Sequence, residues 1–450
     1  MTAARLTRVV RLLYDAREIG LAPMNDSRKS DHKAALLIAV ALLLTAFAAF
    51  TFREINFKRR TLRVGAYPYI PESASMLLRI EQDFEKRHQN VRVEFVDLGG
   101  YYDGGLFEAL RRTKPKVDVV EVDTVFLQDL LDDKLIEPLP DSVLKPDGTF
   151  LPVASNAVTL KGRTFGVPHW VCSNFLFFRK DDPDTNRLSK IANLSELEQV
   201  LNHPSTEEQG LLADMHGKST LGEIYLSALV DEYKNAGEAV SRLGDPTKLD
   251  PAASKTPSRI FWLCPGGINN NSKYHSNGQF YSRQFAHRKA RVKISYSEDL
   301  YYVGDEFLHG VATEEKGIGD PNKDEIGVIG APFADNDHKV LAWVDAVCLR
   351  ANLTGETKRD AMDFIAAYTG DEFNRAVLTP SPGDAPRYLL PARTALYTDP
   401  MILKKAPLYP ELKKIVQDAV TVTASNLNGR LQKIGEELSK HVADAPSPTP

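Results

Sequence analysis

The residues of this sequence best suited to chemistry are a cysteine and a glutamate that lie far apart in the chain. Cys172 stands within GVPHWVCSNFLFFRK and is one of three cysteines in 450 residues. A thiolate is a nucleophile, and a carboxylate can accept the thiol proton where no histidine does. Glu298, in SYSED, is a candidate base, and His169 competes with it. The non-catalytic alternatives are a small buried cysteine at the start of a strand and a solvated glutamate.

Tyrosines and carboxylates gather at the ends of predicted strands. Tyr67 and Tyr69 follow the first predicted strand, Tyr101 and Tyr102 follow the second, and Asp123 ends the third. In an open α/β sheet, ligands bind beyond the carboxyl ends of the strands. Aromatic faces with carboxylates suit a flat, cationic heteroaromatic ligand. The alternative is that the tyrosines only pack at an interface.

Composition excludes several functional classes. The formal net charge is −4, with 26% charged and 43% apolar residues, which argues against a nucleic-acid partner. Cys172, Cys264 and Cys348 are too scattered for a disulfide scaffold, although one bridge stays open. There is no CxxC or HExxH pattern, so we expect no metal. MHGKST at 215–220 has Leu212 where a P-loop needs glycine. We expect a helix N-terminus there instead, capped by Ser219 or Thr220.

The order of elements predicts an α/β fold with two lobes. The first part alternates strands and helices, with strands in TLRVGAY, NVRVEFVDL and VDVVEVD and helices around Met76–Phe84, 106–112 and 124–135. FLFFRK, the start of KISYSEDLYY, IGVIGAPF and LAWVDAVCLR are further strands; SELEQVL, STLGEIYLSALVDEY and ETKRDAMDFIAAYTG are helices. Such lobes, linked by crossing strands, close on a small ligand by hinge motion. We place Cys172 at the boundary between the approach to the cleft and the strand FLFFRK.

The N-terminus carries an export signal or an anchor. Ala34 to Phe52 is nineteen residues without a charge, just enough to span a bilayer core. Ala46-Phe47-Ala48 also fits a signal peptidase site, and Met24 could be the true start. We therefore expect a periplasmic or extracellular protein, with membrane contact only through residues 34–52. The Pro-rich end is expected to be disordered.

Several segments in the same order resemble bacterial thiaminase I, also called thiamine pyridinylase. The resemblance spans roughly residues 61 to 435, and the segments are GAYPYIP, VDVVEVDTVFL, GVPHWVCSNFLFFRK, GLLADMHGKSTLGEIYLSALVD, SYSED, WVDAVCL and YLLPAR. The resemblance implies a type II periplasmic-binding-protein-like fold with an inter-lobe cleft and crossing hinge strands. We expect lobe 1 in 61–170 plus 330–395, lobe 2 in 171–329 plus 396–440, an extension in 1–60 and a disordered tail in 441–450.

The resemblance also implies roles for particular residues. Cys172 would attack the thiamine pyrimidine at C6, Glu298 would deprotonate Cys172 and could later activate the acceptor, and the thiazole would leave from the methylene bridge. The acceptor would be pyridine, another base, an amine or a thiol, and no cofactor is implied. The other expected substrate-binding residues, all tyrosines, a tryptophan or aspartates of the cleft, are Tyr67, Tyr69, Asp97, Tyr101, Asp123, Tyr296, Trp343 and Asp345.

The departures from the family concern the acceptor more than thiamine. Ser173 replaces a threonine, Trp343 replaces a tyrosine, and Gln279 stands where a further cleft tyrosine aligns, with Tyr281 close by. We expect a monomeric transferase. The alternatives are a non-catalytic exported thiamine- or solute-binding protein of a transporter, which needs neither Cys172 nor Glu298, and a membrane-anchored receptor lobe.

Overall fold

The computed structural model describes residues 40, 59–202, 204–264, 269, 271–275, 279–309, 325–336 and 339–442. The chain divides into two units, Met1–Arg59 and Arg60–Pro450, and the elements below belong to the second. The predicted anchor, 34–52, lies outside the described residues except for Val40, as does most of the predicted tail. None of the described helices combines the length and apolar character that a membrane crossing requires.

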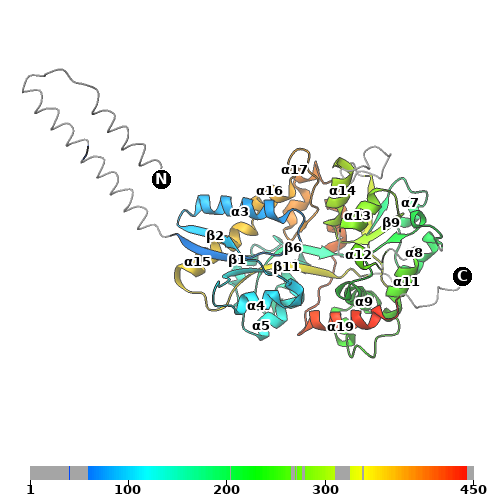
Figure 1. The fold of residues 1–450 in the computed structure, drawn as a ribbon, viewed down its shortest axis with the longest axis horizontal. Coiled ribbons are helices and arrows are strands. Elements are labelled where there is room, and N and C mark those ends of the chain that lie inside the picture. The colour runs from blue at the N-terminus through cyan, green and yellow to red at the C-terminus, as the bar shows by residue number, and fades with distance from the viewer. Residues whose placement is uncertain are drawn as a thin grey trace, which may run out of the picture. The chain divides into compact units, whose positions relative to one another are not determined.

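Two sheets build the predicted two-lobed α/β fold (Figure 1). The larger sheet has the order β12-β6-β11-β3-β1-β2. Its strands are β1 (Arg60–Gly65), β2 (Val91–Phe95), β3 (Val119–Asp123), β6 (Val167–Ser173), β11 (Ala342–Leu349) and β12 (Leu390–Pro391). The smaller sheet has the order β10-β7-β9-β8, with β7 (Phe175–Arg179), β8 (Leu211–Leu212), β9 (Val292–Ser295) and β10 (Ile326–Gly330). A separate two-stranded sheet pairs β4 (Thr159–Leu160) with β5 (Arg163–Thr164).

The larger sheet is covered by helices on both faces. Strands β1, β2 and β3 are parallel, as predicted. One apolar cluster joins the sheet to α3 (Ser73–Arg87), through Met76, Ile80 and Phe84, and to α15 (Gly355–Tyr368). A second cluster joins the other face to α4 (Gly105–Arg111) and α5 (Leu127–Asp132). Every residue of β3 is buried, which explains its nearly continuous apolar sequence.

The chain crosses between the sheets at the segment predicted to carry chemistry. Strand β6 in the larger sheet is followed, after Asn174 alone, by β7 in the smaller one. Cys172 is therefore not at a boundary between loop and strand, as we expected, but is the last residue but one of β6. Within this segment the sequence predicts a strand only at FLFFRK, because the preceding PHWVC does not alternate between apolar and polar residues. A strand that is buried on both faces does not require such alternation, and almost all of β6 is buried.

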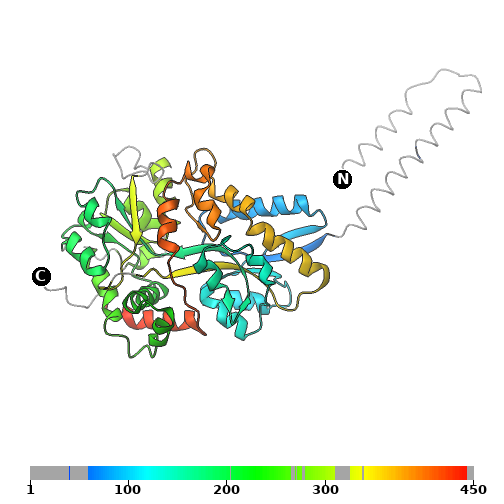
Figure 2. The same cartoon turned by 180° about the vertical axis from the view of Figure 1, so that it is seen from behind.

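The second lobe packs helices around the smaller sheet. These helices include α8 (Leu194–Leu201), α9 (Lys218–Tyr233), α10 (Ala236–Arg242), α11 (Thr256–Trp262), α13 (Gln279–Ala286), α14 (Asp299–His309) and α19 (Leu427–Ser439). Both views show α19 beside α9 (Figure 1 and Figure 2). The remaining helices are α6 (Pro152–Ala157), α7 (Thr185–Leu188), α12 (Ser272–His275), α16 (Asp371–Leu378), α17 (Pro400–Leu403) and α18 (Tyr409–Val416). The expected lobe boundaries stay predictions.

The start of α9 corrects one prediction. The helix begins at Lys218, and Gly217 is its N-cap residue. Ser219 and Thr220 lie within the first turn and are not caps, contrary to our expectation. A Cβ atom on Gly217 would lie 2.4 Å from the His275 ring, so close packing explains why glycine takes the place of a hydroxyl cap. Ser219 and Thr220 instead line a cavity.

Candidate active site

The register of the larger sheet brings the predicted chemical residues together. Strand β11 runs antiparallel between β3 and β6, so that Asp345 pairs with Asp123 and Trp343 pairs with Cys172. The register between β11 and β6 shifts after Asp345, where an irregularity interrupts the ladder. Asp123 is the last residue of β3, and Cys172 lies near the end of β6. These side chains therefore meet at the edge where β3 and β6 end, as the rule for open sheets predicts.

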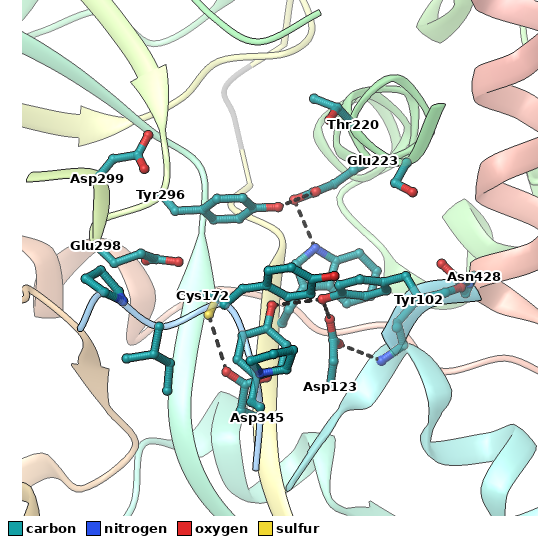
Figure 3. Close-up of a pocket in the computed structure, with 18 of the residues that line it drawn as sticks. Tyr102, Asp123, Cys172, Thr220, Glu223, Tyr296, Glu298, Asp299, Asp345 and Asn428 are labelled. Atoms are coloured by element: carbon teal, nitrogen blue, oxygen red, sulfur yellow. Dashed lines mark hydrogen bonds between the residues drawn. The ribbon is translucent and has the colours of Figure 1, made fainter. Parts of the chain in front are cut away.

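A cavity of about 610 Å³ opens at this edge, between the two sheets (Figure 3). It is lined mostly by aromatic and acidic side chains from both lobes. The lining residues are Tyr67, Pro68, Tyr69, Ile70, Pro71, Tyr102, Asp123, Val125, Cys172, Ser219, Thr220, Glu223, Gln279, Tyr296, Glu298, Asp299, Tyr302, Trp343, Asp345, Asn428 and Leu431. Its volume suits a small organic ligand.

Cys172 is half-buried at the cavity, with carboxyl groups around it. Its thiol donates to Asp345, with 3.8 Å between Sγ and Oδ2. Burial first, and then the nearby carboxyls of Asp345 and Glu298, raise the pKa of this thiol well above its ordinary value. The thiol is therefore protonated in the free protein at neutral pH, and a base or a neighbouring positive charge would favour its ionisation.

Glu298 lies across the cavity from Asp345, on the side of the smaller sheet (Figure 3). It follows β9 and immediately precedes α14. Burial, followed by the charge of Asp299, raises its pKa to about 7. A carboxyl with that pKa is poised to exchange protons at neutral pH. Cys172 and Glu298 thus line one cavity and do not point into separate cores.

Asp123 and Asp345 form a pair of adjacent carboxyls. The Asp123 carboxyl accepts hydrogen bonds from the Tyr102 hydroxyl at 2.8 Å and from the Val125 amide at 2.9 Å. Burial still raises its pKa to about 6, and burial with the Asp123 charge raises the pKa of Asp345 well above its usual value. No lysine or arginine is among the described lining residues. The cavity is therefore built to receive a cation.

The tyrosines form one contiguous cluster on the side of the larger sheet. Tyr67 shares a hydrogen bond of 2.9 Å with the Tyr102 hydroxyl. Tyr69 is 55% exposed and stacks on Tyr102, with ring centroids 5.7 Å apart. Two glycines with positive φ, Gly100 and Gly104, bracket the short turn that carries Tyr102. The cluster offers ring faces at the mouth of the cavity.

Most of the predicted site residues line the cavity, and two do not. Those that line it are Tyr67, Tyr69, Asp123, Cys172, Tyr296, Glu298, Trp343 and Asp345. Asp97 is exposed and outside the lining; its carboxylate accepts from the Gly99 amide at 2.9 Å. Tyr101 is 1% exposed and lies behind the wall, where its hydroxyl accepts from the Asp123 amide at 2.7 Å. Neither residue therefore lines the cavity.

The position of His169 excludes it as the base for Cys172. This histidine is buried and lies outside the lining, and its Nδ1 is 2.6 Å from Glu121 Oε1. Cys172 and Cys348 form no disulfide bond in the described part of the chain. Tyr281 belongs to the core, whereas Gln279 lines the cavity. The Cys172 thiol donates to Asp345, and Glu298, the base that the resemblance implies, lines the same cavity.

Tyr102 and Glu223 are among the lining residues that sequence reasoning missed. The sequence points to Tyr101 and Tyr102 together, but two consecutive tyrosines in a turn give no indication of which faces inward, and the expected binding residue was Tyr101. Glu223 lies on α9 in LGEIYLSALV, where a single acidic residue interrupts an apolar run. A carboxyl on the buried face of a helix is a signal that could have been used.

Within the described residues, no group of three or more histidine, cysteine or acidic side chains is placed to hold a metal ion. The described lining supplies a thiol, several carboxyls with raised pKa values, and aromatic faces.

Comparison with known proteins shows which family the chain resembles. A family model described as Thiaminase-1 domain matches residues 173–314, which include Glu223 and Glu298. Thiaminase-1 of Paenibacillus thiaminolyticus is 26% identical over 420 residues, covering 91% of this chain and 92% of that protein. The chain resembles thiaminase I. The resemblance expected from the sequence is confirmed.

Solved structures agree on the fold. Clostridium botulinum thiaminase I in complex with thiamin matches with a TM-score of 0.71 and 21% identity, over 85% of this chain and all of that one. A solute-binding protein of an ABC transporter from Agrobacterium radiobacter, in complex with ribitol, matches with a TM-score of 0.62 and 16% identity, over 86% of this chain and 95% of that one. The two-lobed fold related to periplasmic binding proteins is therefore confirmed.

Proposed function

We propose that this protein is a thiamine-degrading enzyme of the thiaminase I type, a transferase that moves the pyrimidinylmethyl group of thiamine to a nucleophilic base. The observation that carries the proposal is one cavity that combines a thiol, Cys172, with a carboxyl of raised pKa, Glu298, among tyrosines and acidic groups. The similarity to thiaminase-1 over 91% of the chain supports it.

Thiamine matches the cavity in charge and shape. Its thiazolium is a flat cation, and carboxyls with raised pKa values become more favourably ionised when a cation enters. Its aminopyrimidine is flat and carries hydrogen-bond donors that a carboxylate accepts. The tyrosine cluster with Tyr69 at the mouth supplies ring faces for stacking.

Cys172 is the nucleophile of the proposed mechanism, and Glu298 is its base. In the free protein, burial and then the charges of the nearby carboxyls keep the thiol protonated. A bound thiazolium opposes their effect, so the thiol ionises more readily once thiamine is present. Glu298 takes the proton, the sulfur bonds to C6 of the pyrimidine, and the thiazole leaves the methylene carbon with its bonding electron pair. The Cys172 thiolate therefore forms mainly when thiamine is bound.

The test uses full-length protein with thiamine and either pyridine or aniline. We expect thiamine to disappear, and Cys172→Ser to bind thiamine without consuming it. Intact mass after thiamine alone should show one pyrimidinylmethyl group on the unaltered protein and none on Cys172→Ser. If the unaltered protein binds thiamine and leaves it intact, the protein is a binding protein and the proposal is wrong.

We also propose that the protein is exported and monomeric. The export proposal rests on the uncharged segment 34–52 and on Ala46-Phe47-Ala48 as a cleavage signal. N-terminal sequencing of protein recovered from the producing cell distinguishes cleavage after Ala48 from a retained anchor. Light scattering of the purified protein tests the monomer.

A further inference from the structure

Besides Glu298, a second glutamate, Glu223, lines the cavity at a different position. Glu223, on α9, lines the cavity, and Figure 3 shows it near the hydroxyl end of the Tyr296 ring, whereas Glu298 lies toward the other end. Its Oε1 accepts from Trp343 Nε1 at 3.0 Å and from Asn174 Nδ2 at 2.8 Å. Its Oε2 accepts from the Tyr296 hydroxyl. The donors come from β11, from the crossing between β6 and β7, and from the end of β9.

These hydrogen bonds orient the Glu223 carboxylate and leave it able to accept one more hydrogen bond. A carboxylate offers about four acceptor sites, of which three are taken. The three donors favour the charged form, yet burial outweighs them and raises the pKa of Glu223 to about 7. Asp123 adds to that rise, and Glu223 in turn acts on Cys172 and Tyr296. The group is therefore oriented, and it exchanges protons at neutral pH.

The second half of the proposed reaction needs more than one base. Once Glu298 has accepted the Cys172 proton, it is neutral while the covalent intermediate lasts, and this proton must return to sulfur when the enzyme is released. An amine or thiol acceptor brings another proton, which has to leave as the acceptor bonds to carbon. Glu298 cannot hold both protons.

We propose that Glu223 is the general base for the acceptor, and that the cavity is built for acceptors that carry an N–H or S–H bond. The inference rests on the proposed function and extends it to the second substrate. The acceptor's lone pair forms the bond to the methylene carbon, and its proton passes to Glu223. The electron pair of the exocyclic double bond returns to the pyrimidine ring. The C6–S bond breaks, its pair leaves on sulfur, and the thiolate takes back the proton from Glu298.

A comparison of pyridine with aniline as the acceptor distinguishes a role of Glu223 as a base from a purely structural role. Pyridine has no N–H bond, so it forms a pyridinium product and transfers no proton to Glu223. Aniline is neutral at the assay pH and has a proton to lose. With saturating thiamine, kcat/KM for the acceptor reports the second half-reaction, while kcat/KM for thiamine reports the first and does not depend on the acceptor.

The variant is Glu223→Gln in the full-length protein, because glutamine keeps the size and can still accept from Trp343 and Asn174. We expect kcat/KM for aniline to fall about 100-fold, the usual worth of a general base, and at least tenfold more than kcat/KM for pyridine. In the unaltered protein, kcat/KM for aniline should also fall as the pH drops through about 7. This fall below about pH 7 should be absent from kcat/KM for pyridine in the unaltered protein and from kcat/KM for aniline in Glu223→Gln.

Thr220→Val is the matched control, since Thr220 lies one turn before Glu223 on the same helix, also lines the cavity, and does not titrate. It should leave the ratio of the aniline and pyridine constants as in the unaltered protein. Equal losses for both acceptors in Glu223→Gln, including no loss at all, would overturn the proposal. Failure of the unaltered protein to consume thiamine with either acceptor would instead contradict the proposed function.

Discussion

At the scale of single residues, the site is a set of acidic groups placed where they are unfavourable without a ligand. Asp123 and Asp345 are paired across two strands, and both are buried. Neighbouring carboxyls in such surroundings cannot all ionise, so their pKa values rise. This arrangement costs folding free energy in the free protein and favours a cationic substrate. Function and stability therefore make opposite demands on the same side chains.

Asp345→Asn tests whether the paired carboxyls lower stability while they favour binding of a cationic substrate. Asparagine keeps the shape and a hydrogen-bond acceptor for Cys172, but it removes a buried group that repels the Asp123 charge. We expect a higher Tm without ligand and thiamine binding weakened about 10- to 100-fold, measured by thermal melts and titration. Asp97→Asn is the control, because that carboxylate lies outside the cavity; it should leave both quantities close to those of the unaltered protein. A lower Tm for Asp345→Asn would contradict the repulsion.

Glu298→Gln tests the base of the first half-reaction. Glu298 must be deprotonated to accept the thiol proton. At subsaturating thiamine, where the pKa of the free protein governs the rate, adduct formation should therefore become faster as the pH rises through about 7 and level off above. Glutamine removes the base, and we expect adduct formation, followed by intact mass in a single turnover, to slow about 10²- to 10⁴-fold. Glu223→Gln, in the same cavity, should slow this step far less. Adduct formation at the unaltered rate in Glu298→Gln would assign the base elsewhere.

At the scale of elements, the register of β11 decides which residues become neighbours. This strand lies antiparallel between β3 and β6, and it places Trp343 beside Cys172 and Asp345 beside Asp123. The sequence predicts β3 and β11 from their apolar patterns but not β6, and it predicts the parallel order of β1, β2 and β3 from the alternation with helices. It does not predict that a strand some 170 residues later inserts between β3 and β6. Local patterns carry no information on such pairings.

Helix α9 shows the same limit in another way. The sequence predicts a helix over STLGEIYLSALVDEY, and that prediction is confirmed. Which of its side chains faces the cavity depends on α19, which crosses it closely: a Cβ atom on Gly222 would lie 2.2 Å from the Leu431 carbonyl oxygen, and one on Gly435 would lie 1.8 Å from that of Lys218. Glu223 was therefore missed, although Cys172 and Glu298 were found through the resemblance to a family.

Gly435→Ala tests this helix contact. The new methyl group meets the backbone of α9, which cannot move aside as a flexible side chain can, so the helices must separate. We expect a loss of about 1–3 kcal/mol in the free energy of unfolding, measured with denaturant. Thiamine binding should weaken too, since Asn428 and Leu431 of α19 line the cavity. Gly429→Ala, whose methyl group would face the Asn426 side chain on the same helix, should cost much less. Equal losses for the two variants would mean that the close crossing is unimportant.

At the scale of the whole molecule, the cavity draws its walls from both lobes, so ligand charge and lobe position act on the same groups. Asp123 and Asp345 belong to the larger sheet, Glu298 follows a strand of the smaller one, and Glu223 lies on α9. Two-lobed folds of this type close around their ligands by hinge motion. Closure on a cation would bring all four carboxyls to bear on one positive charge and would lower their pKa values together.

Thiamine binding should therefore release protons. The pKa values of about 6 for Asp123 and about 7 for Glu223 and Glu298 mean that these groups are partly protonated near neutral pH in the free protein. A bound cation favours their charged forms, so the affinity should rise with pH from about 5.5 to 8, by up to about tenfold per pH unit for each proton released. Calorimetry on Cys172→Ser in buffers with different protonation enthalpies counts the protons. A neutral thiamine analogue of the same shape is the control and should release few. If thiamine and the neutral analogue show the same pH dependence, the carboxyls do not respond to the thiazolium charge, and the cavity recognises its ligand by shape and stacking alone.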